Sequence, residues 1–291
     1  HPGAIFDMQG DFTLNVPSGD PVFNNMGTFL RTVGTGSVRV EPELNQGGEL
    51  EIRSGIVEFH APFTQTAGAT TLAGGNLGGT STINLQGGTL AGEGSVAQNV
   101  TNTGGTVSPG SSAGILSLNG DYAQGGGGQL CIELGGGTQG TGFDHLRVGG
   151  TASLNGTLLL KLIDGFVPTP TDTFQILTAT SVTGTFASAS GANWGGGNFL
   201  ETVYGPTDVS LEAQSGAPTI IASSLTWNSS TQQFGFQFGG EAGKTYRVEA
   251  SEDFLLWEEI GTYTLTSSPQ DFVDPNPDEL KSRFYRVVVV P

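Results

Sequence analysis

The sequence contains a single cysteine, Cys131, so no disulfide can form within the chain. Basic residues are also scarce, because 10 Lys and Arg stand against 27 Asp and Glu and give a formal net charge of −17. Such a chain lacks the positive surface that nucleic acids and anionic membranes require. No stretch approaches 18 consecutive apolar residues, which excludes a transmembrane helix. The sequence therefore predicts neither nucleic-acid binding nor membrane insertion, and we expect Cys131 to be a small buried hydrophobe.

Charged residues make up only 13% of the chain, whereas glycine accounts for 48 of its 291 residues. The hydrophobic fraction of 36% still suffices for a core, and the glycines lack the three-residue period of collagen. No secretory signal stands at the start, so we expect a chain beginning at His1 to be a mature or trimmed product. The composition predicts an ordered, β-rich protein of one large or two ordinary domains. Its acidic, Ser- and Thr-rich surface suits a secreted or cell-surface location.

A short glycine phrase recurs along the first part of the chain. The last glycines of successive phrases are Gly27, Gly48, Gly68, Gly88 and Gly105. Their separations of 21, 20, 20 and 17 residues are too regular for unrelated loops. Between the glycines, apolar and polar residues alternate with a period of two rather than 3.6. Each phrase therefore predicts one coil of a solenoid.

A coil of about 20 residues has room for three strands of roughly four to five residues, joined by corners that need glycine or asparagine. Such coils would stack about 4.8 Å apart as a right-handed parallel β-helix, with backbone hydrogen bonds between neighbouring coils. An antiparallel sandwich or jelly roll would show the same alternation, but the fixed period favours the solenoid. Residues 23–213 are thus predicted as a parallel β-helix, and residues 1–22 as an N-terminal cap or an incomplete first coil.

The open end of a β-solenoid exposes unpaired strand edges, which natural proteins normally cover. If residues 1–22 cover this edge incompletely, another subunit could dock there by strand pairing. The apolar residues Phe6, Phe12, Leu14 and Val16 mark the candidate polymerisation segment. Head-to-tail assembly into fibres is therefore one hypothesis, with the protein itself as partner.

The sequence pattern changes after a predicted linker at residues 214–218. Aromatic residues become dense, and short alternating stretches such as 233–238 and 283–287 are separated by turn residues. Residues 219–291 are therefore predicted as a small antiparallel β-sandwich. The predicted fold class of the whole chain is all-β.

Two stretches resemble known families. Residues 102–116, which read NTGGTVSPGSSAGIL and precede Gly120-Asp121-Tyr122, resemble the secreted β-helical passengers of bacterial autotransporters, with Ala113 where proline is more usual. This resemblance covers about residues 24–213 and implies a parallel β-helix, but adhesins, proteases and matrix proteins share it. Residues 243–251, with Trp257 and residues 283–287, resemble C-terminal modules on secreted proteins of verrucomicrobial and planctomycete-like bacteria.

An enzyme that cleaves polysaccharides is one functional hypothesis, because pectin lyases and polygalacturonases are parallel β-helices. Such sites need clustered acids, often with a basic residue. The candidates are Glu41, Glu43, Glu49, Glu51 and Glu58 with Arg39 and Arg53. Their alternation is also what the solvent face of any strand shows. We therefore predict no catalytic residue.

Metal sites are weakly indicated. His1 could bind copper together with His60 or His145, but three histidines in the chain are a thin supply. The Pro-rich stretch 271–279 concentrates carboxylates that could hold calcium, although its spacing is not that of an EF-hand and favours a solvated loop. No metal or cofactor is therefore predicted. Calcium is the one metal kept as a candidate.

Trp194 stands in the glycine-rich stretch 191–197, where a lone indole has little core to enter. It is the best single candidate for a contact with carbohydrate or a partner.

The predicted function is an extracellular structural or adhesive protein, a cell-surface or matrix scaffold with itself and extracellular polysaccharide as partners. The alternatives are a polysaccharide-active β-helix enzyme, lyase or hydrolase, and a carbohydrate-binding protein.

Overall fold

The computed structural model describes residues 2–15, 19–195, 198–214, 218–240, 243–275 and 283–290. These residues form strands and no helix, which confirms the prediction of an all-β chain for them. Accordingly, none of them belongs to a helix long and apolar enough to cross a membrane. The chain divides into two compact units, one of residues 1–168, 172–191 and 202–212 and the other of residues 169–171, 192–201 and 213–291.

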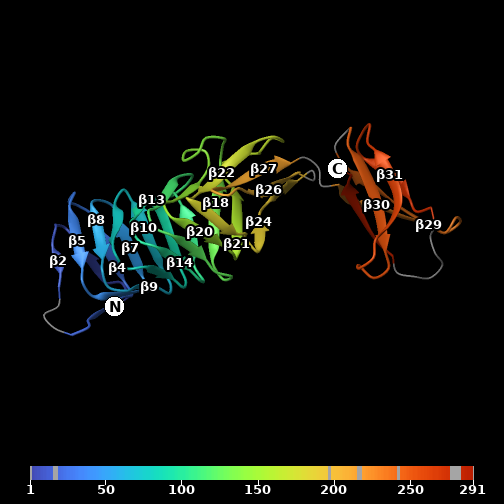
Figure 1. The fold of residues 1–291 in the computed structure, drawn as a ribbon. Coiled ribbons are helices and arrows are strands. Elements are labelled where there is room, and N and C mark those ends of the chain that lie inside the picture. The colour runs from blue at the N-terminus through green and yellow to red at the C-terminus, as the bar shows by residue number, and fades with distance from the viewer. Residues whose placement is uncertain are drawn as a thin grey trace. The chain divides into compact units, whose positions relative to one another are not determined.

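The first unit consists mainly of parallel strands in three ladders (Figure 1). The first ladder is β1 (Ile5–Asp7), β4 (Thr28–Arg31), β7 (Glu49–Ile52), β10 (Ala69–Ala73), the start of β13 (Thr89–Val96), β15 (Thr106–Pro109), β18 (Gln129–Leu134), β21 (Thr157–Leu162) and β24 (Ser188–Ser190). The second is β2 (Thr13–Leu14), β5 (Ser37–Val40), β8 (Ile56–Phe59), β11 (Asn76–Gly79), the end of β13, β16 (Ile115–Leu118), β19 (His145–Val148) and β22 (Thr173–Thr178). The third is β3 (Val22–Asn25), β6 (Glu43–Gln46), β9 (Phe63–Gln65), β12 (Ile83–Leu85), β14 (Val100–Asn102), β17 (Tyr122–Gln124), β20 (Thr151–Leu154) and β23 (Ser181–Gly184).

The chain visits these ladders in the same order each time, first, second and third. The parallel order ends where β22 pairs with β27 (Asp208–Gln214) in the antiparallel sense. Alternation along each strand places one set of side chains inward. In the first ladder, for example, Phe29, Leu50, Thr70 and Leu90 occupy successive register positions and are all buried. The period of two noted in the sequence thus separates the core from the outer face.

The glycine phrases lie against one another. A Cβ atom on Gly48 would lie 2.2 Å from the carbonyl oxygen of Gly27, and one on Gly68 would lie 1.8 Å from that of Gly48. A Cβ on Gly88 would likewise lie 2.3 Å from the carbonyl oxygen of Gly68. Gly68 and Gly88 also have φ angles of +65° and +71°, which side chains rarely adopt. These positions therefore need glycine for both reasons.

Buried amide side chains follow the inner edge of the third ladder. They are Asn25, Gln46, Gln65, Asn102 and Gln124. Each donates to a backbone carbonyl of the first ladder: Gln46 Nε2 lies 3.1 Å from Ala69 O in β10, and Gln65 Nε2 lies 3.0 Å from Thr89 O in β13. Leu85 replaces an amide in this row. Because buried amides must be hydrogen-bonded, this row helps to fix the position of the third ladder against the first.

The second unit contains two three-stranded antiparallel sheets. One has the order β28 (Thr219–Asn228), β29 (Gln233–Gly239), β32 (Gln270–Val273), and the other β31 (Glu258–Thr264), β30 (Thr245–Ser251), β33 (Phe284–Val289). Residues of both sheets share one core, formed by Phe236, Phe238, Tyr246, Val248, Leu265 and Phe272. The unit also includes β25 (Asn193–Gly195), which pairs with β26 (Asn198–Tyr204). The dense aromatic residues of the C-terminal sequence are thus largely core residues.

A buried carboxylate ties the two sheets of the second unit together. Asp274 follows β32 and is fully buried. Its Oδ2 accepts hydrogen bonds from Arg283 Nη1 at 2.9 Å and from the Tyr285 hydroxyl at 2.8 Å. Tyr285 belongs to β33 in the other sheet, so this cluster joins the sheets by charge as well as by packing.

Candidate binding surfaces

The N-terminal end of the first unit is an edge of all three ladders. Among the residues that the structure describes, β1, β2 and β3 pair on one side only, with β4, β5 and β6. Apolar side chains are exposed at this end, namely Ile5, Phe6, Phe12, Val22 and Met26. The ring of Phe6 packs edge-on against Phe29, 5.3 Å between centroids. Free backbone groups and apolar side chains together form a surface suited to strand pairing.

The predicted polymerisation segment falls on this edge. Phe6 lies in β1, Phe12 precedes β2, and both are exposed. Leu14 lies in β2 and is half-buried. Val16 is outside the described residues. Three of the four predicted residues therefore belong to the two short strands at the edge or to the connection between them.

A buried arginine lies beneath this edge. Arg31 ends β4, and its side chain is 0% exposed. One guanidinium nitrogen donates to the carbonyl oxygens of Met8, at 3.1 Å, and of Gly10. The other pairs with the carboxylate of Asp11. A buried charge of this kind requires such partners.

The structure spreads the predicted catalytic set over the three ladders. Glu49 and Glu51 lie on β7 in the first ladder, Arg39 and Glu58 are register neighbours in the second, and Glu43 begins β6 in the third. Each arginine pairs with a carboxylate two residues away, Arg39 with Glu41 and Arg53 with Glu51. The hydrogen bond from Arg53 lowers the pKa of Glu51. The two arginines of the set therefore form local ion pairs, and the carboxylates are divided among the ladders and do not line one face together.

A hollow of about 520 Å³ lies beside the N-terminal edge. Its lining includes the carboxylates of Asp20, Glu41 and Glu43, together with Pro21 and Pro62. Within the described residues, no group of three or more His, Cys, Asp and Glu side chains is arranged to hold a metal ion.

The histidines are engaged separately. His60 Nδ1 lies 3.2 Å from the Thr80 hydroxyl, and Nε2 lies 3.4 Å from Glu58. His145 is buried, with Nδ1 2.8 Å from the carbonyl oxygen of Gln175, and burial lowers its pKa. His1 is outside the described residues, as are residues 276–279 of the candidate calcium loop. His60 and His145 thus each bond to neighbours of their own.

Cys131 is buried, as predicted from its strand-like context. Trp194 has its backbone in β25, where the neighbouring Asn193 pairs with Phe199 of β26. The side chain of Trp194 is outside the described residues. Its predicted role as a contact therefore stays a prediction.

A buried aspartate anchors the segment between β18 and β19. Asp144 Oδ1 accepts the backbone N–H of Gly114, and Oδ2 accepts that of Glu133, both at 2.8 Å. Burial outweighs these two hydrogen bonds and raises the pKa of Asp144 from 3.8 to about 7. The folded chain thus binds this proton more tightly than the unfolded chain does.

The raised pKa of Asp144 predicts a pH dependence of stability. The contribution of this group is fully present below about pH 4 and is lost as the pH rises through about 7, by about 4 kcal/mol. Urea unfolding between pH 4 and 8 measures this loss. Asp144→Asn should be less stable, because its amide would face a backbone N–H, and should lack this slope. Exposed Asp164→Asn is the control, and an unchanged slope in Asp144→Asn would contradict the assignment.

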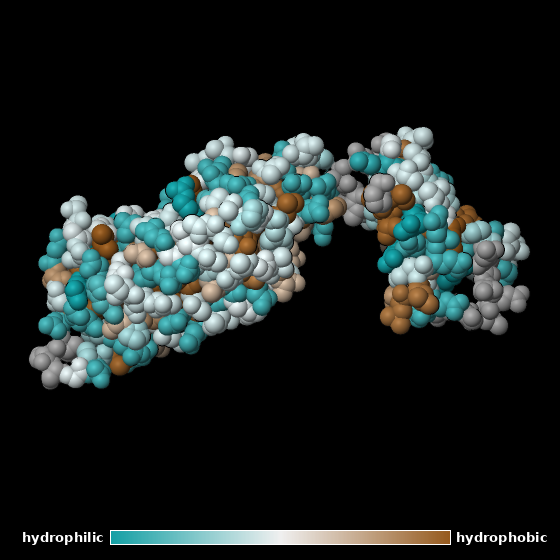
Figure 2. Space-filling model, in the orientation of Figure 1, coloured by the Kyte–Doolittle hydropathy of each residue, from teal (hydrophilic) through white to brown (hydrophobic). Residues whose placement is uncertain are grey.

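The second unit exposes three consecutive apolar side chains. Phe254, Leu255 and Leu256 are 59%, 81% and 79% exposed. Asp253 holds their turn by accepting the N–H groups of Leu255 at 2.8 Å and Leu256 at 3.0 Å. Figure 2 shows brown apolar patches on this unit beside teal polar ones. Exposed apolar groups on an ordered turn are typical of contact surfaces.

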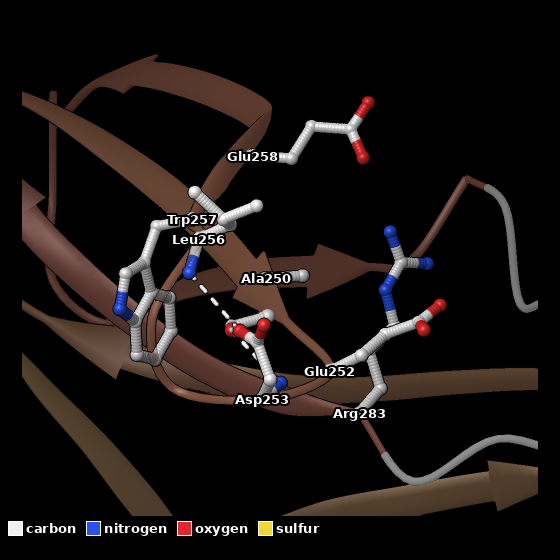
Figure 3. A pocket seen from close by; sticks show the side chains of 8 residues that line it. Ala250, Glu252, Asp253, Leu256, Trp257, Glu258 and Arg283 are labelled. Carbon is white, nitrogen blue, oxygen red and sulfur yellow. Dashed lines mark hydrogen bonds between the residues drawn. The ribbon is translucent and has the colours of Figure 1, made fainter.

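A pocket of about 300 Å³ adjoins this turn (Figure 3). Trp257 and Arg283 stand on opposite sides of it in this view, with Asp253 between them. Glu252 and Glu258 add two more carboxylates. Arg286 lies over the Trp257 ring, 4.2 Å from its centroid. In the sequence, Trp257 belongs to the stretches that resemble C-terminal modules of secreted proteins. The spacing of these stretches gives no sign of the pocket.

No known family model matches the sequence, and no curated protein matches it at a significant level. The chemistry of the N-terminal edge, of the outer faces and of the second unit therefore guides the functional assignment.

Proposed function

We propose that the first unit is a right-handed parallel β-helix and that the protein is an extracellular structural or adhesive scaffold. The continuous register of the three ladders supports the β-helix: Leu50 pairs with Phe29 on one side and with Thr70 on the other. A chain that visits the ladders in fixed order completes one turn in about 20 residues. The right-handed sense follows from the strong preference of parallel connections.

The resemblance to secreted passengers supports the extracellular location. Repeated coils suit a scaffold, because each coil contacts mainly its neighbours and the stack grows without a change in the core. The second unit is proposed to be a β-sandwich module, which the shared core of its two sheets supports. Its exposed apolar turn and pocket would then serve attachment.

The outer face of the third ladder supports a polysaccharide partner. One row of register neighbours crosses this face, with side chains that are polar or small and carry no charge. The row is Asn24, Asn45, Thr64, Asn84, Thr101, Ala123, Ser153 and Thr183. Amide and hydroxyl groups donate and accept hydrogen bonds, as neutral sugars do. Neighbours in the row also bond to each other, as Asn45 Nδ2 does to Asn24 Oδ1 at 3.0 Å.

Binding to insoluble neutral polysaccharides tests this function. The protein is incubated with cellulose, chitin and cross-linked dextran, and its depletion from solution is measured. A variant with Asn45→Asp, Asn84→Asp and Thr101→Asp should lose at least tenfold in affinity, because charges replace the neutral groups. The matched control carries Thr71→Asp, Thr89→Asp and Thr106→Asp in the first ladder. Equal depletion by all three proteins, or none by the wild type, would contradict the proposed surface.

A further inference from the structure

The first strands of the chain form a strap, residues 4–14, over the outer edge of the first and second ladders. β1 contributes three register pairs to β4, from Ile5 with Thr28 to Asp7 with Leu30. β2 contributes only two pairs to β5. The backbone N–H of Met8 adds a hydrogen bond to Leu30 O at 2.7 Å. Pairing this short is weak by itself, so the strap needs a further anchor.

Arg31 supplies such an anchor, in addition to the fully buried side chain of Met8 and the hydrogen bond from the Thr32 hydroxyl to Asp7. Its register neighbours in the next two strands of the first ladder are Ile52 and Leu72, so it occupies a position that is otherwise apolar. Its guanidinium binds the strap through two backbone carbonyls and through Asp11. The ion pair connects a buried group to a half-exposed one, because the Asp11 side chain is 53% exposed.

Two glycines make room for this ion pair. A Cβ atom on Gly36 would lie 2.4 Å from a carboxylate oxygen of Asp11, and one on Gly34 would lie 2.4 Å from a guanidinium nitrogen of Arg31. The corner between β4 and β5 is therefore shaped around the pair. The ion pair, the two backbone carbonyl acceptors and the space left by the two glycines therefore all lie at this one contact.

We propose that residues 4–14 are an exchangeable strap: held by Arg31 they cover β4 and β5 of their own chain, and once released they take the same place on a second copy. The second copy is the fitting occupant because its strap carries the same Asp11, carbonyl groups and strand register. Exchange of an identical element is a low-cost route to assembly. The inference rests on the proposed scaffold function and gives the head-to-tail assembly predicted from the sequence a specific contact and a control.

Hydrogen exchange tests the anchor. In Arg31→Met, whose side chain suits the apolar position, the amides of residues 5–14 should exchange at least tenfold faster than in the wild type. The rest of the first unit should keep its protection. Arg39→Met removes an exposed arginine from neighbouring β5 and should behave as the wild type. Equal exchange of residues 5–14 in the two variants would overturn the role of Arg31.

Cross-linking tests the second copy as occupant. Ile5 and Thr28 are register neighbours, so copies with Ile5→Cys are mixed with copies carrying Thr28→Cys and treated with a short bis-maleimide. Cys131 is buried and should stay unmodified. Mixed dimers should form above the background of either variant alone, and at least tenfold faster in the Arg31→Met background. Background levels in both would overturn the exchange, whereas polysaccharide binding would be unaffected, so the two proposals fail separately.

Discussion

Replacing Gly68 with alanine is expected to lower the free energy of unfolding of the first unit by about 4 kcal/mol or more. The new Cβ would lie 1.8 Å from the carbonyl oxygen of Gly48, and the backbone of Gly48 cannot move away without disturbing its own contact with Gly27. The φ angle of +65° adds strain for any side chain. Urea unfolding followed by far-ultraviolet circular dichroism measures the loss.

Gly126→Ala is the matched control for this experiment. Gly126 has no heavy atom within 4 Å of an added Cβ. Its replacement should leave the unfolding midpoint nearly unchanged. If Gly68→Ala and Gly126→Ala are equally stable, the glycines of successive phrases do not lie against one another.

Asp274→Ala is expected to destabilise the second unit by about 3 to 5 kcal/mol, because it removes one partner of a buried charge pair. The hydroxyl of Tyr285 and the guanidinium of Arg283 would lose the acceptor that joins the two sheets. All three tryptophans belong to this unit, so their fluorescence during urea unfolding reports the change.

Asp271→Ala serves as the control for the buried carboxylate. Asp271 lies on β32 close in sequence to Asp274, but it is exposed, and its carboxylate accepts a hydrogen bond from Gln237 Nε2 at 2.9 Å. Its replacement should shift the midpoint by less than about 1 kcal/mol. A similar shift in both variants would show that the two sheets are held together without the Asp274 cluster.

Much of the architecture could be predicted from the sequence because it repeats. The spacing of Gly27, Gly48 and Gly68 indicated units of about 20 residues, and the structure brings these glycines into contact. The alternation in residues 49–53 indicated which side chains are buried. Both signals are local, so a pattern along the chain is enough to reveal them.

The buried polar groups could not be predicted in the same way. In the sequence, Gln65 is an ordinary polar residue. In the structure it is buried, and its amide donates a hydrogen bond to the carbonyl oxygen of Thr89, 24 residues away. His145 is likewise buried, and it bonds to Gln175 and Thr178, which lie 30 and 33 residues away. Arg31 sits where periodicity predicts an apolar side chain. Each depends on a partner that is distant in sequence, which no local pattern identifies.

The candidate sites show the same limit. The seven acids and arginines of the catalytic hypothesis alternate as predicted, but which ladder each one joins depends on where the chain turns. The aromatic density of residues 219–291 predicts a sandwich, but it does not predict that Phe254, Leu255 and Leu256 are exposed together on one turn. Its exposure follows from the hydrogen bonds of Asp253 to the backbone, which propensity alone does not specify.

Distances between spin labels test the stacked coils most directly. Asn24 and Thr183 lie in one row of the third ladder, seven strand steps apart, and Asn24 and Thr101 lie four steps apart. At about 4.8 Å for each step, the stacked arrangement predicts about 34 Å for the first pair and about 19 Å for the second. Nitroxides on cysteines introduced at these positions allow both distances to be measured by electron double resonance. Two similar distances, or a first distance below about 20 Å, would contradict the stack.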